Sequence, residues 1–367
     1  MTGLADAGGP RLDINLGHLV ANWEECRRQS GGAATSAVIK ADAYGIGATR
    51  AAQALALAGC ETFFVATLAE AVDVRQVAGS AAIYVLNGPY GDLSDYLEFD
   101  IRPVISSLEM LDHWQHAGSL AHRKLPIAVH IDTGMNRLGL SPDEWQSPAV
   151  QTRLKDLPLA MVMSHLACAD EAAHPLSARQ AALFDQLTDA SQMRSLANSA
   201  GIFLDPRYQY DLTRPGIALH GAAIGDVHPP LKPVVTATSS VLATRTVRAG
   251  ESVSYGSTYE FDVSTPVAVV EVGYADGYLR SGSSQGQDCR AHIWINEHRA
   301  PVLGRVTMDL TIVDITGIPD VAAGTPVELF GANLPIDELA LATGTNTYEL
   351  LTRMGPRFTR TYHNPGD

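Results

Sequence analysis

Cysteine is scarce in this sequence. The chain has four cysteines among 367 residues, at Cys26, Cys60, Cys168 and Cys289, and none of them forms a Cys-x-x-Cys pair. Such wide spacing argues against the disulfide framework of small secreted domains and against a structural zinc motif. We therefore expect free thiols, no bound metal, and a protein of the reducing cytoplasm.

An excess of basic charge and long apolar runs are also missing. Lysine and arginine number 26 against 40 aspartates and glutamates, which gives a formal net charge of −14. This balance argues against a nucleic-acid partner, because binding to a polyanion depends on clustered basic groups. No apolar run approaches the roughly 20 residues of a membrane-spanning helix. Residues 1–10 lack the basic and apolar regions of a secretory signal, so we expect no membrane association.

The chain does contain a regular alternation of apolar strand patterns and helical patterns. Eight such strands with helical crossovers predict a closed (β/α)8 barrel of the TIM type. An open doubly wound sheet is the alternative, but the Gly-x-Gly-x-x-Gly turn expected after its first strand is absent. The expected strands are residues 36–40, 62–67, 81–86, 101–105, 126–131, 159–165, 195–199 and 208–214.

A change of pattern follows Gly221, and Pro229, Pro230 and Pro233 mark the junction. From Val234 onward the sequence has short strands rich in valine and threonine, which predict a mostly antiparallel β domain. We therefore expect two domains, a barrel over residues 1–233 and a β domain over residues 234–367. The short strand at residues 11–15 could pair with the β domain.

The stretch AVIKADAYGIG, residues 37–47, places Lys40 at the end of an apolar strand. Burial there would lower the lysine pKa because it disfavours the charged form, and a neutral amine can bond covalently to an aldehyde. The glycines allow a phosphate to approach the backbone, and the next helix offers its positive N-terminus. We expect Tyr44 in this loop to be exposed. A lysine that merely extends along the surface is the ordinary alternative.

Further polar side chains follow later strands, at the rim where TIM barrels carry their chemistry. Taken singly, each has an ordinary explanation as a core histidine, a surface ion pair or a turn residue. Their convergence on one rim favours a shared site. These residues are Arg137, His165, Asn198, Ser199 and Arg214.

Together with Lys40, these groups fit pyridoxal 5′-phosphate. Lys40 would hold the aldehyde and Arg214 would face the pyridine nitrogen. Ser199, the amides near Gly216 and Ile217, and the Tyr44 hydroxyl would hold the phosphate. Because arginine stays protonated, a ring nitrogen that faces it stays unprotonated, which weakens the ring as an electron sink. Such a site favours removal and return of a proton over transamination.

The motifs AVIKADAYGIG, HIDTGMNRLGL, SHLACAD, ANSAG, RPGIALHG, VSYGSTY, VGYADGYLR and GRVTMDL resemble those of bacterial alanine racemases, which are fold-type III pyridoxal phosphate enzymes. The resemblance runs from about Arg11 to Tyr362. It implies interconversion of L-alanine and D-alanine by two-base proton transfer, with D-alanine supplied for peptidoglycan. It also implies a head-to-tail homodimer, whose active sites lie between the barrel of one subunit and the β domain of the other.

The resemblance also implies individual roles. Lys40 and Tyr255, the latter from the second subunit, would be the bases on the two faces of the amino-acid substrate. His165 would bridge Arg214 and that tyrosine, and Arg137 would bind the cofactor's phenolic oxygen and the substrate carboxylate. The Met308 amide would be another carboxylate contact, and Tyr274, with Asp309 close by, would restrict the entrance. The implied cofactor contacts are Lys40, Tyr44, Arg137, His165, Asn198, Ser199, Arg214, Gly216 and Ile217.

The chain departs from the family pattern at three positions. His130 stands where many members carry a carbamylated lysine, so a bound anion such as chloride could take the place of the carbamate near Arg137. His220 replaces a common tyrosine, and Pro356 stands where some members have a phosphate-contacting tyrosine.

Two other functions stay open from the sequence. A racemase of the same fold acting on serine or on several amino acids would differ only around Tyr274 and Met308. A carrier that binds pyridoxal phosphate without turnover would need no second domain, and the residues after Pro233 argue against it.

Overall fold

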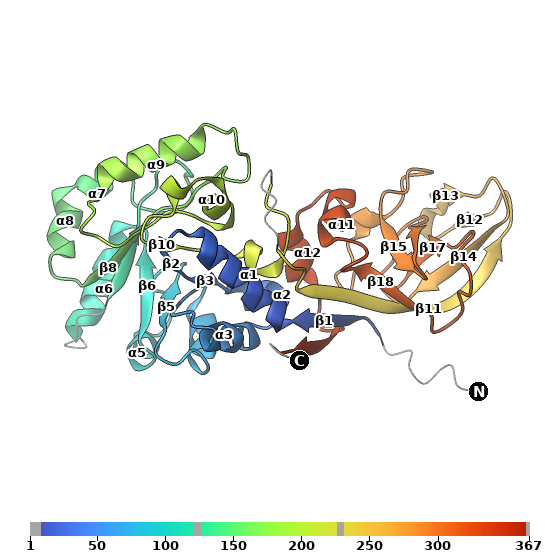
Figure 1. Ribbon diagram of the computed structural model, residues 1–367, viewed down its shortest axis with the longest axis horizontal. Helices are drawn as coiled ribbons and strands as arrows, with labels where there is room; N and C mark the ends of the chain where they lie inside the picture. Colours follow the sequence, from blue (N-terminus) through green and yellow to red (C-terminus); the bar gives the residue numbers. More distant parts are fainter. Residues whose placement is uncertain (1–8, 121–125, 226–230, 365–367) are drawn as a thin grey trace. The chain divides into compact units, whose positions relative to one another are not determined.

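The computed structural model describes residues 9–120, 126–225 and 231–364 (Figure 1). The chain divides into two compact units, Leu16–Lys232 in one and Met1–Asn15 together with Pro233–Asp367 in the other. Pro229 and Pro230 of the expected junction, and residues 1–8 of the N-terminal segment, lie outside the described residues. Among those described, no helix has the length and apolar character needed to cross a bilayer.

The unit Leu16–Lys232 is built on parallel strands, with helices around their outside (Figure 1). Seven strands follow one another in the order β3 to β9, each paired with the next along the chain. Their bounds are β3 (Ala37–Val38), β4 (Thr62–Val65), β5 (Ala82–Val85), β6 (Ile101–Ile105), β7 (Ile127–His130), β8 (Leu159–Met163) and β9 (Arg194–Ser195).

A last strand, β10 (Leu212–Thr213), closes this sheet into a ring. On one side it pairs in parallel with β2 (Ala34–Thr35), which directly precedes β3. On the other side the Asp211 and Arg214 amides donate to the Arg194 and Ala197 carbonyls, each at 3.0 Å. The predicted TIM-type barrel with a separate, mostly antiparallel β domain is therefore confirmed.

Apolar side chains from the barrel strands fill its interior. One buried cluster takes Val38 from β3, Phe64 from β4 and Val104 from β6, and it continues across the ring to Leu212 of β10. Strands buried on both faces read as near-continuous apolar runs, which is why the sequence pattern located β4 to β8 well. The strand expected over residues 208–214 is much shorter, because Pro206–Tyr208 form a 3-10 turn and only Leu212–Thr213 pair in the sheet. The interior packing fixes the strand ends, and these ends position the polar residues of the rim.

The helices of this unit mostly follow the strands, as expected for βα units. Two short helices follow each other between β7 and β8, because the Ser147 side chain caps a new helix that begins at Pro148. The helices are α1 (Leu16–Gln29), α2 (Lys40–Gly45), α3 (Ala48–Leu57), α4 (Leu68–Arg75), α5 (Leu93–Glu98), α6 (Leu108–Leu120), α7 (Pro142–Gln146), α8 (Pro148–Leu154), α9 (Leu176–Leu187), α10 (Ser199–Leu204), and the short 3-10 turns η1 (Pro206–Tyr208) and η2 (Ile217–His220).

The second unit is organised around the long strand β11 (Val235–Val247). This strand pairs antiparallel with β1 (Arg11–Asn15), β14 (Thr265–Val270) and β18 (Pro326–Phe330). Strand β1 also runs parallel to β19 (Thr359–His363), so both ends of the chain join the same sheet. The remaining elements are β12 (Ser252–Val253), η3 (Tyr255–Ser257), β13 (Tyr259–Glu260), η4 (Arg280–Gly282), β15 (His292–Ile295), β16 (His298–Pro301), β17 (Thr311–Asp314), α11 (Ile336–Ala342) and α12 (Thr347–Arg353).

Candidate active site

Lys40 lies just beyond the first barrel strand rather than within it. Strand β3 ends at Val38, and Lys40 is the first residue of α2. The four residues that follow, Ala41 to Tyr44, all have left-handed backbone angles, with φ between 51° and 57°. The prediction of a strand extending to Lys40 was therefore wrong by two residues. A left-handed conformation costs roughly 1–2 kcal/mol for each such residue, and strain of this kind concentrates at functional sites.

Hydrogen bonds from both ends hold the left-handed turn. The Ala43 amide donates to the Ile39 carbonyl at 2.9 Å, and the Gly47 amide donates to the Asp42 carbonyl at 2.9 Å. The Asp42 carboxylate also accepts from the Ala48 amide at 2.7 Å, at the start of α3. The turn is thereby tied to the strand before it and to the helix after it.

The surroundings of Lys40 disfavour its charged form. The side chain is half-buried, and this burial lowers its pKa, with a further lowering from the positive charge of Arg137. The carboxylate of Glu70 acts in the opposite direction. A lysine with a lowered pKa offers a larger fraction of neutral amine at neutral pH, which is the form that reacts with an aldehyde.

Arg214 and His165 come together on the same rim. The guanidinium of Arg214 is buried and donates to the Ser164 carbonyl and the Ser195 hydroxyl. It also lies 3.4 Å from Nδ1 of His165. Burial lowers the pKa of Arg214 to about 9, so the group remains charged at neutral pH. The guanidinium is thus a fixed cation whose position is set by backbone and hydroxyl oxygens.

The two buried histidines near Arg214, His130 and His165, are neutral. Burial, followed by the charge of Arg214, lowers the pKa of His130 to about 4 and the pKa of His165 well below its usual range. Each ring can therefore accept a hydrogen bond on one nitrogen and donate from the other. The positive charge of Arg137 also lowers the pKa of both histidines, although the Arg137 side chain is exposed.

Ser199, Gly216 and Tyr44 form a small cradle. The Ser199 hydroxyl oxygen accepts the amides of Gly216 at 2.9 Å and Ala218 at 3.1 Å. No acceptor for the Ser199 hydroxyl proton is found within the described ranges, so that proton can be donated to a bound anion. A Cβ on residue 216 would lie 2.3 Å from the Tyr44 hydroxyl oxygen, so only glycine allows this approach.

Tyr44 and Asn198 differ from the predictions made for them. Tyr44 was expected to be exposed, but its relative exposure is 6%, because its ring packs 4.8 Å from the His220 ring and its hydroxyl lies over Gly216. Asn198 does not end a strand, since β9 stops at Ser195. Its side chain instead caps α10 by accepting the Gly201 amide at 3.0 Å. Ile217 begins the buried turn η2 directly after Gly216.

His220 is an imidazole buried between its neighbours. Its relative exposure is 5%, and neither ring nitrogen has a hydrogen-bond partner among the residues that the structure describes. Burial lowers its pKa to about 3. The ring therefore stays neutral, and its visible contact is the Tyr44 ring.

This burial predicts a loss of stability at acidic pH. The folded pKa of His220 lies below the unfolded value near 6.5, so only the unfolded chain takes up a proton as the pH falls below about 6.5. Lowering the pH from 7.5 to 5 should cost about 2 kcal/mol at this residue. Urea denaturation of the natural protein and of His220→Phe at both pH values measures this loss of unfolding free energy. An equal loss of stability in both proteins would refute the assignment.

The predicted residues of the β unit lie on its loops. Tyr255 begins η3 and has a relative exposure of 74%. The preceding Ser254 side chain donates to the Arg305 carbonyl at 2.7 Å, which joins this loop to the GRVTMDL loop. Tyr274 and Met308, both well exposed, lie on adjacent segments, because the Ala275 amide donates to the Met308 carbonyl at 2.9 Å.

Arg357 is a residue that the sequence did not single out. Its guanidinium pairs with Asp309 at 2.7 Å and with the buried carboxylate of Asp276 at 3.4 Å. Asp309 is thus held by an ion pair beside the Met308 segment. The only signal in the sequence was a lone arginine after Pro356, and such arginines are usually solvated.

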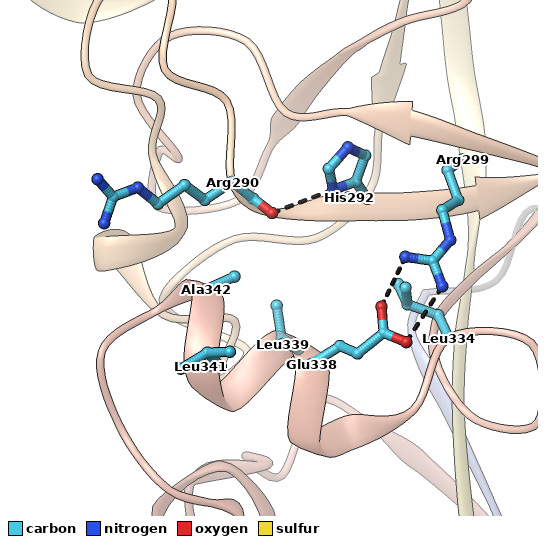
Figure 2. Close-up of a pocket in the computed structure, with 8 residues that line it drawn as sticks. All are labelled: Arg290, His292, Arg299, Leu334, Glu338, Leu339, Leu341 and Ala342. Carbon is cyan, nitrogen blue, oxygen red and sulfur yellow. Dashed lines mark hydrogen bonds and ion pairs between the residues drawn. The ribbon is translucent and has the colours of Figure 1, made fainter.

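A cavity of about 460 Å³ in the β unit has none of the predicted site residues in its wall. Figure 2 shows two of its lining residues, Arg299 and Glu338, paired directly with each other, through hydrogen bonds of 2.6 and 3.1 Å. Arg290, a further lining residue, pairs with Asp288. Because these charges are neutralised locally, the rim of the barrel is the better candidate for chemistry.

The chain is similar to known proteins along both of its units. A family profile described as "Alanine racemase, N-terminal domain" matches residues 14–223, and one described as "Alanine racemase, C-terminal domain" matches residues 234–362. The chain is 44% identical to a protein of Agrobacterium fabrum named "Alanine racemase, biosynthetic", over 96% of this chain and 93% of that protein. It is 42% identical to one from the same organism named "Alanine racemase, catabolic", over 98% and 94%.

A solved structure resembles the whole chain. It is an alanine racemase of Bartonella henselae with covalently bound pyridoxal phosphate, and it superimposes with a TM-score of 0.89 at 33% sequence identity. The match covers 97% of this chain and 100% of that one.

Proposed function

The chain belongs to the alanine racemase family, and on that premise we propose that it interconverts L-alanine and D-alanine with pyridoxal 5′-phosphate as its cofactor. The observation that carries this function is the set of groups on one barrel rim. A lysine with a lowered pKa stands on the same rim as a buried arginine–histidine pair and a hydroxyl–amide cradle. The family match over both units supports the same activity.

The residues on the rim fit this cofactor. When bound, pyridoxal phosphate supplies an aldehyde and an electron-withdrawing ring that stabilises negative charge at the substrate α-carbon. Lys40 would hold the aldehyde carbon. The Ser199 hydroxyl, the Tyr44 hydroxyl and the backbone at Gly216 and Ile217 would hold the phosphate, and Asn198 would shape this cradle by capping α10.

Arg214 and His165 would set the protonation of the site. A charged guanidinium facing the pyridine nitrogen keeps that nitrogen unprotonated, because two cations in contact repel each other. A neutral His165 beside Arg214 can accept or donate a hydrogen bond toward the catalytic tyrosine. Arg137 would bind the substrate carboxylate, and its exposed side chain leaves it available.

Two bases would move the α-proton. The Lys40 amine would accept or return it on one face of the substrate, and Tyr255 would do so on the other. The Met308 amide, Tyr274 and Asp309 would bound the substrate side chain and carboxylate. The ion pair between Asp309 and Arg357 supports a fixed shape for that segment.

We further propose a head-to-tail homodimer in which Tyr255 serves the barrel of the second subunit. In this dimer the barrel domain of one subunit, residues 1–233, would contact the β domain of the other, residues 234–367. Residues 11–15 belong to the β sheet. The high exposure of Tyr255, Tyr274 and Met308 supports it, since large exposed apolar side chains that lie together mark interaction surfaces.

The cofactor assignment is tested by chemical trapping. Treating the loaded protein with borohydride should fix pyridoxal phosphate to the peptide that contains Lys40, and peptide mass spectrometry reads the position. Lys155 of the same barrel unit provides an internal control and should stay unmodified. A reduced adduct on any peptide without Lys40 would remove the basis for this site.

His130 gives a prediction about anions. This histidine is buried and neutral and cannot carry a carbamate. We propose that a chloride ion near Arg137 takes the place of the carbamate, so the activity of the natural protein should not depend on bicarbonate and should rise with chloride. His130→Lys should make activity depend on bicarbonate. A bicarbonate-free preparation of the natural protein that recovers activity only with bicarbonate contradicts this.

The cellular role is the last part of the proposal. We propose that the enzyme acts in the cytoplasm and supplies D-alanine for peptidoglycan. The relative named biosynthetic supports that role, although a relative named catabolic is almost as similar. Growth of a D-alanine-requiring bacterium that carries this gene, without added D-alanine, tests it.

A further inference from the structure

We propose that Glu70 is a positioning residue that clamps the left-handed turn after Lys40 and so fixes the reactive amine. The inference deepens the function proposed for Lys40 and rests on it. Nothing in the sequence distinguishes Glu70 from an ordinary helix-capping glutamate.

The Glu70 side chain bonds to two separate segments of the chain. One carboxylate oxygen accepts the Ala41 amide at 2.6 Å. The other accepts the amides of Ala66 at 2.8 Å and Thr67 at 3.2 Å. The Thr67 hydroxyl in return accepts the Glu70 amide at 3.4 Å, which completes a capping box at the start of α4.

The bond to Ala41 goes beyond what a capping box requires. Ala41 is 29 positions earlier in the chain and is the first residue of the left-handed turn. Its nitrogen is bonded to the carbonyl carbon of Lys40, so the two residues share this peptide group. A charged acceptor on that amide holds the peptide plane in place, and hydrogen bonds to ionised acceptors are stronger than neutral ones. Loss of the bond would release the turn at the residue next to the amine.

The charge of Glu70 also bears on Lys40. Two charged groups act on the pKa of this amine, the cation Arg137 and the carboxylate of Glu70, while the neighbouring His165 is neutral. Burial and Arg137 lower the Lys40 pKa, and Glu70 opposes them. The nearby Asp42 carboxylate is turned to the Ala48 amide. Glu70 therefore limits how far the lysine pKa falls while it also holds the backbone.

A matched control lies elsewhere in the same barrel. Glu144 forms a capping box with Ser141 at the start of α7, where its carboxylate accepts the Ser141 amide at 2.8 Å. The bonds found for it stay within its own turn. Glu70→Gln and Glu144→Gln thus remove the same charge from the same motif, and only the first touches the lysine turn.

The experiment measures the Lys40 amine directly in the cofactor-free protein. Acetylation of Lys40 by acetic anhydride, read by peptide mass spectrometry across a pH series, gives its titration midpoint. Glu70→Gln should lower that midpoint, because the carboxylate that opposes the fall in the Lys40 pKa is gone, and it should weaken pyridoxal phosphate binding, measured by equilibrium dialysis, by about tenfold. Glu70→Ala, which loses every acceptor, should bind more weakly still. Glu144→Gln should change neither value.

Urea denaturation separates this role from helix capping. Both glutamine variants should lose some stability, since each weakens one cap, and Glu70→Gln should lose more, because it also weakens the bond to Ala41. If Glu70→Gln matches Glu144→Gln in midpoint and in cofactor affinity, Glu70 is only a cap and the proposal is overturned. The Lys40 midpoint is measured without turnover, so a natural protein that fails to racemise alanine would refute the proposed function and leave this test intact.

Discussion

Replacing Tyr255 with phenylalanine should slow the racemisation of alanine by about 10²–10⁴-fold, the range expected for loss of a positioned base. Tyr255 is highly exposed at the start of η3 and is followed by Gly256 with a positive φ, so its side chain is presented outward on a tight loop. The variant keeps the ring and loses only the hydroxyl. Folding and cofactor attachment at Lys40 should therefore be retained, and absorbance of the bound cofactor checks this.

The stereochemistry of exchange makes the test sharper. In D₂O the variant retains the base on the Lys40 face only, so one enantiomer of alanine should exchange its α-proton much faster than the other. Tyr259→Phe is the matched control, because Tyr259 lies four residues further on and packs its ring against Phe261. Near-normal and equal exchange of both enantiomers by Tyr255→Phe would show that Tyr255 is not a base.

Lys40→Ala should have a larger effect, because one residue would provide both the covalent anchor and a base. We expect no borohydride-stable adduct and a loss of racemisation of at least about 10⁴-fold. Chiral chromatography of alanine after incubation measures the activity, and circular dichroism confirms that the variant is folded. A variant that keeps more than a few per cent of the activity would contradict the role of Lys40.

Mixing the two variants tests the proposed dimer. If Tyr255 serves the second subunit, a mixed dimer of Lys40→Ala and Tyr255→Phe chains has one site with both defects and one intact site. Random reassociation should then restore about a quarter of the natural activity. No recovery, with mixed dimers shown to form, would place both bases in one subunit.

The sequence predicted the barrel because its strands are buried and uniformly apolar, and because their carboxyl ends share one rim. Arg214 and His165 follow different strands, and their placement came from chain order alone. Their contact at 3.4 Å agrees with that expectation. Parallel topology is thus enough to bring distant polar residues to one place.

The turn after Lys40 could not be predicted in the same way. Ala41, Ala43 and Tyr44 carry no local signal for a left-handed conformation, and only Asp42 and the flanking glycines hint at it. The burial of Tyr44 likewise depends on His220, which is distant in sequence and arrives through closure of the ring. Contacts between residues so far apart in the sequence override local conformational preference, so composition and periodicity do not reveal them.

Glu70 and Arg357 were missed for a related reason. Each belongs to a residue type that is usually solvated or capping, and the sequence around it is ordinary. Their roles depend on a second segment, Ala41 for Glu70 and Asp276 for Arg357. A carboxylate that bonds two distant segments is visible only once the chain is folded.

The most direct test of the account is a racemisation assay of the cofactor-loaded protein with a panel of single L-amino acids that includes alanine and serine. We expect L-alanine to be converted until the two enantiomers are present in equal amounts, and the reaction from D-alanine to reach the same ratio. Alanine should react faster than serine or any other member of the panel. Failure of the folded, loaded protein to form D-alanine, or faster turnover of serine, would contradict the account.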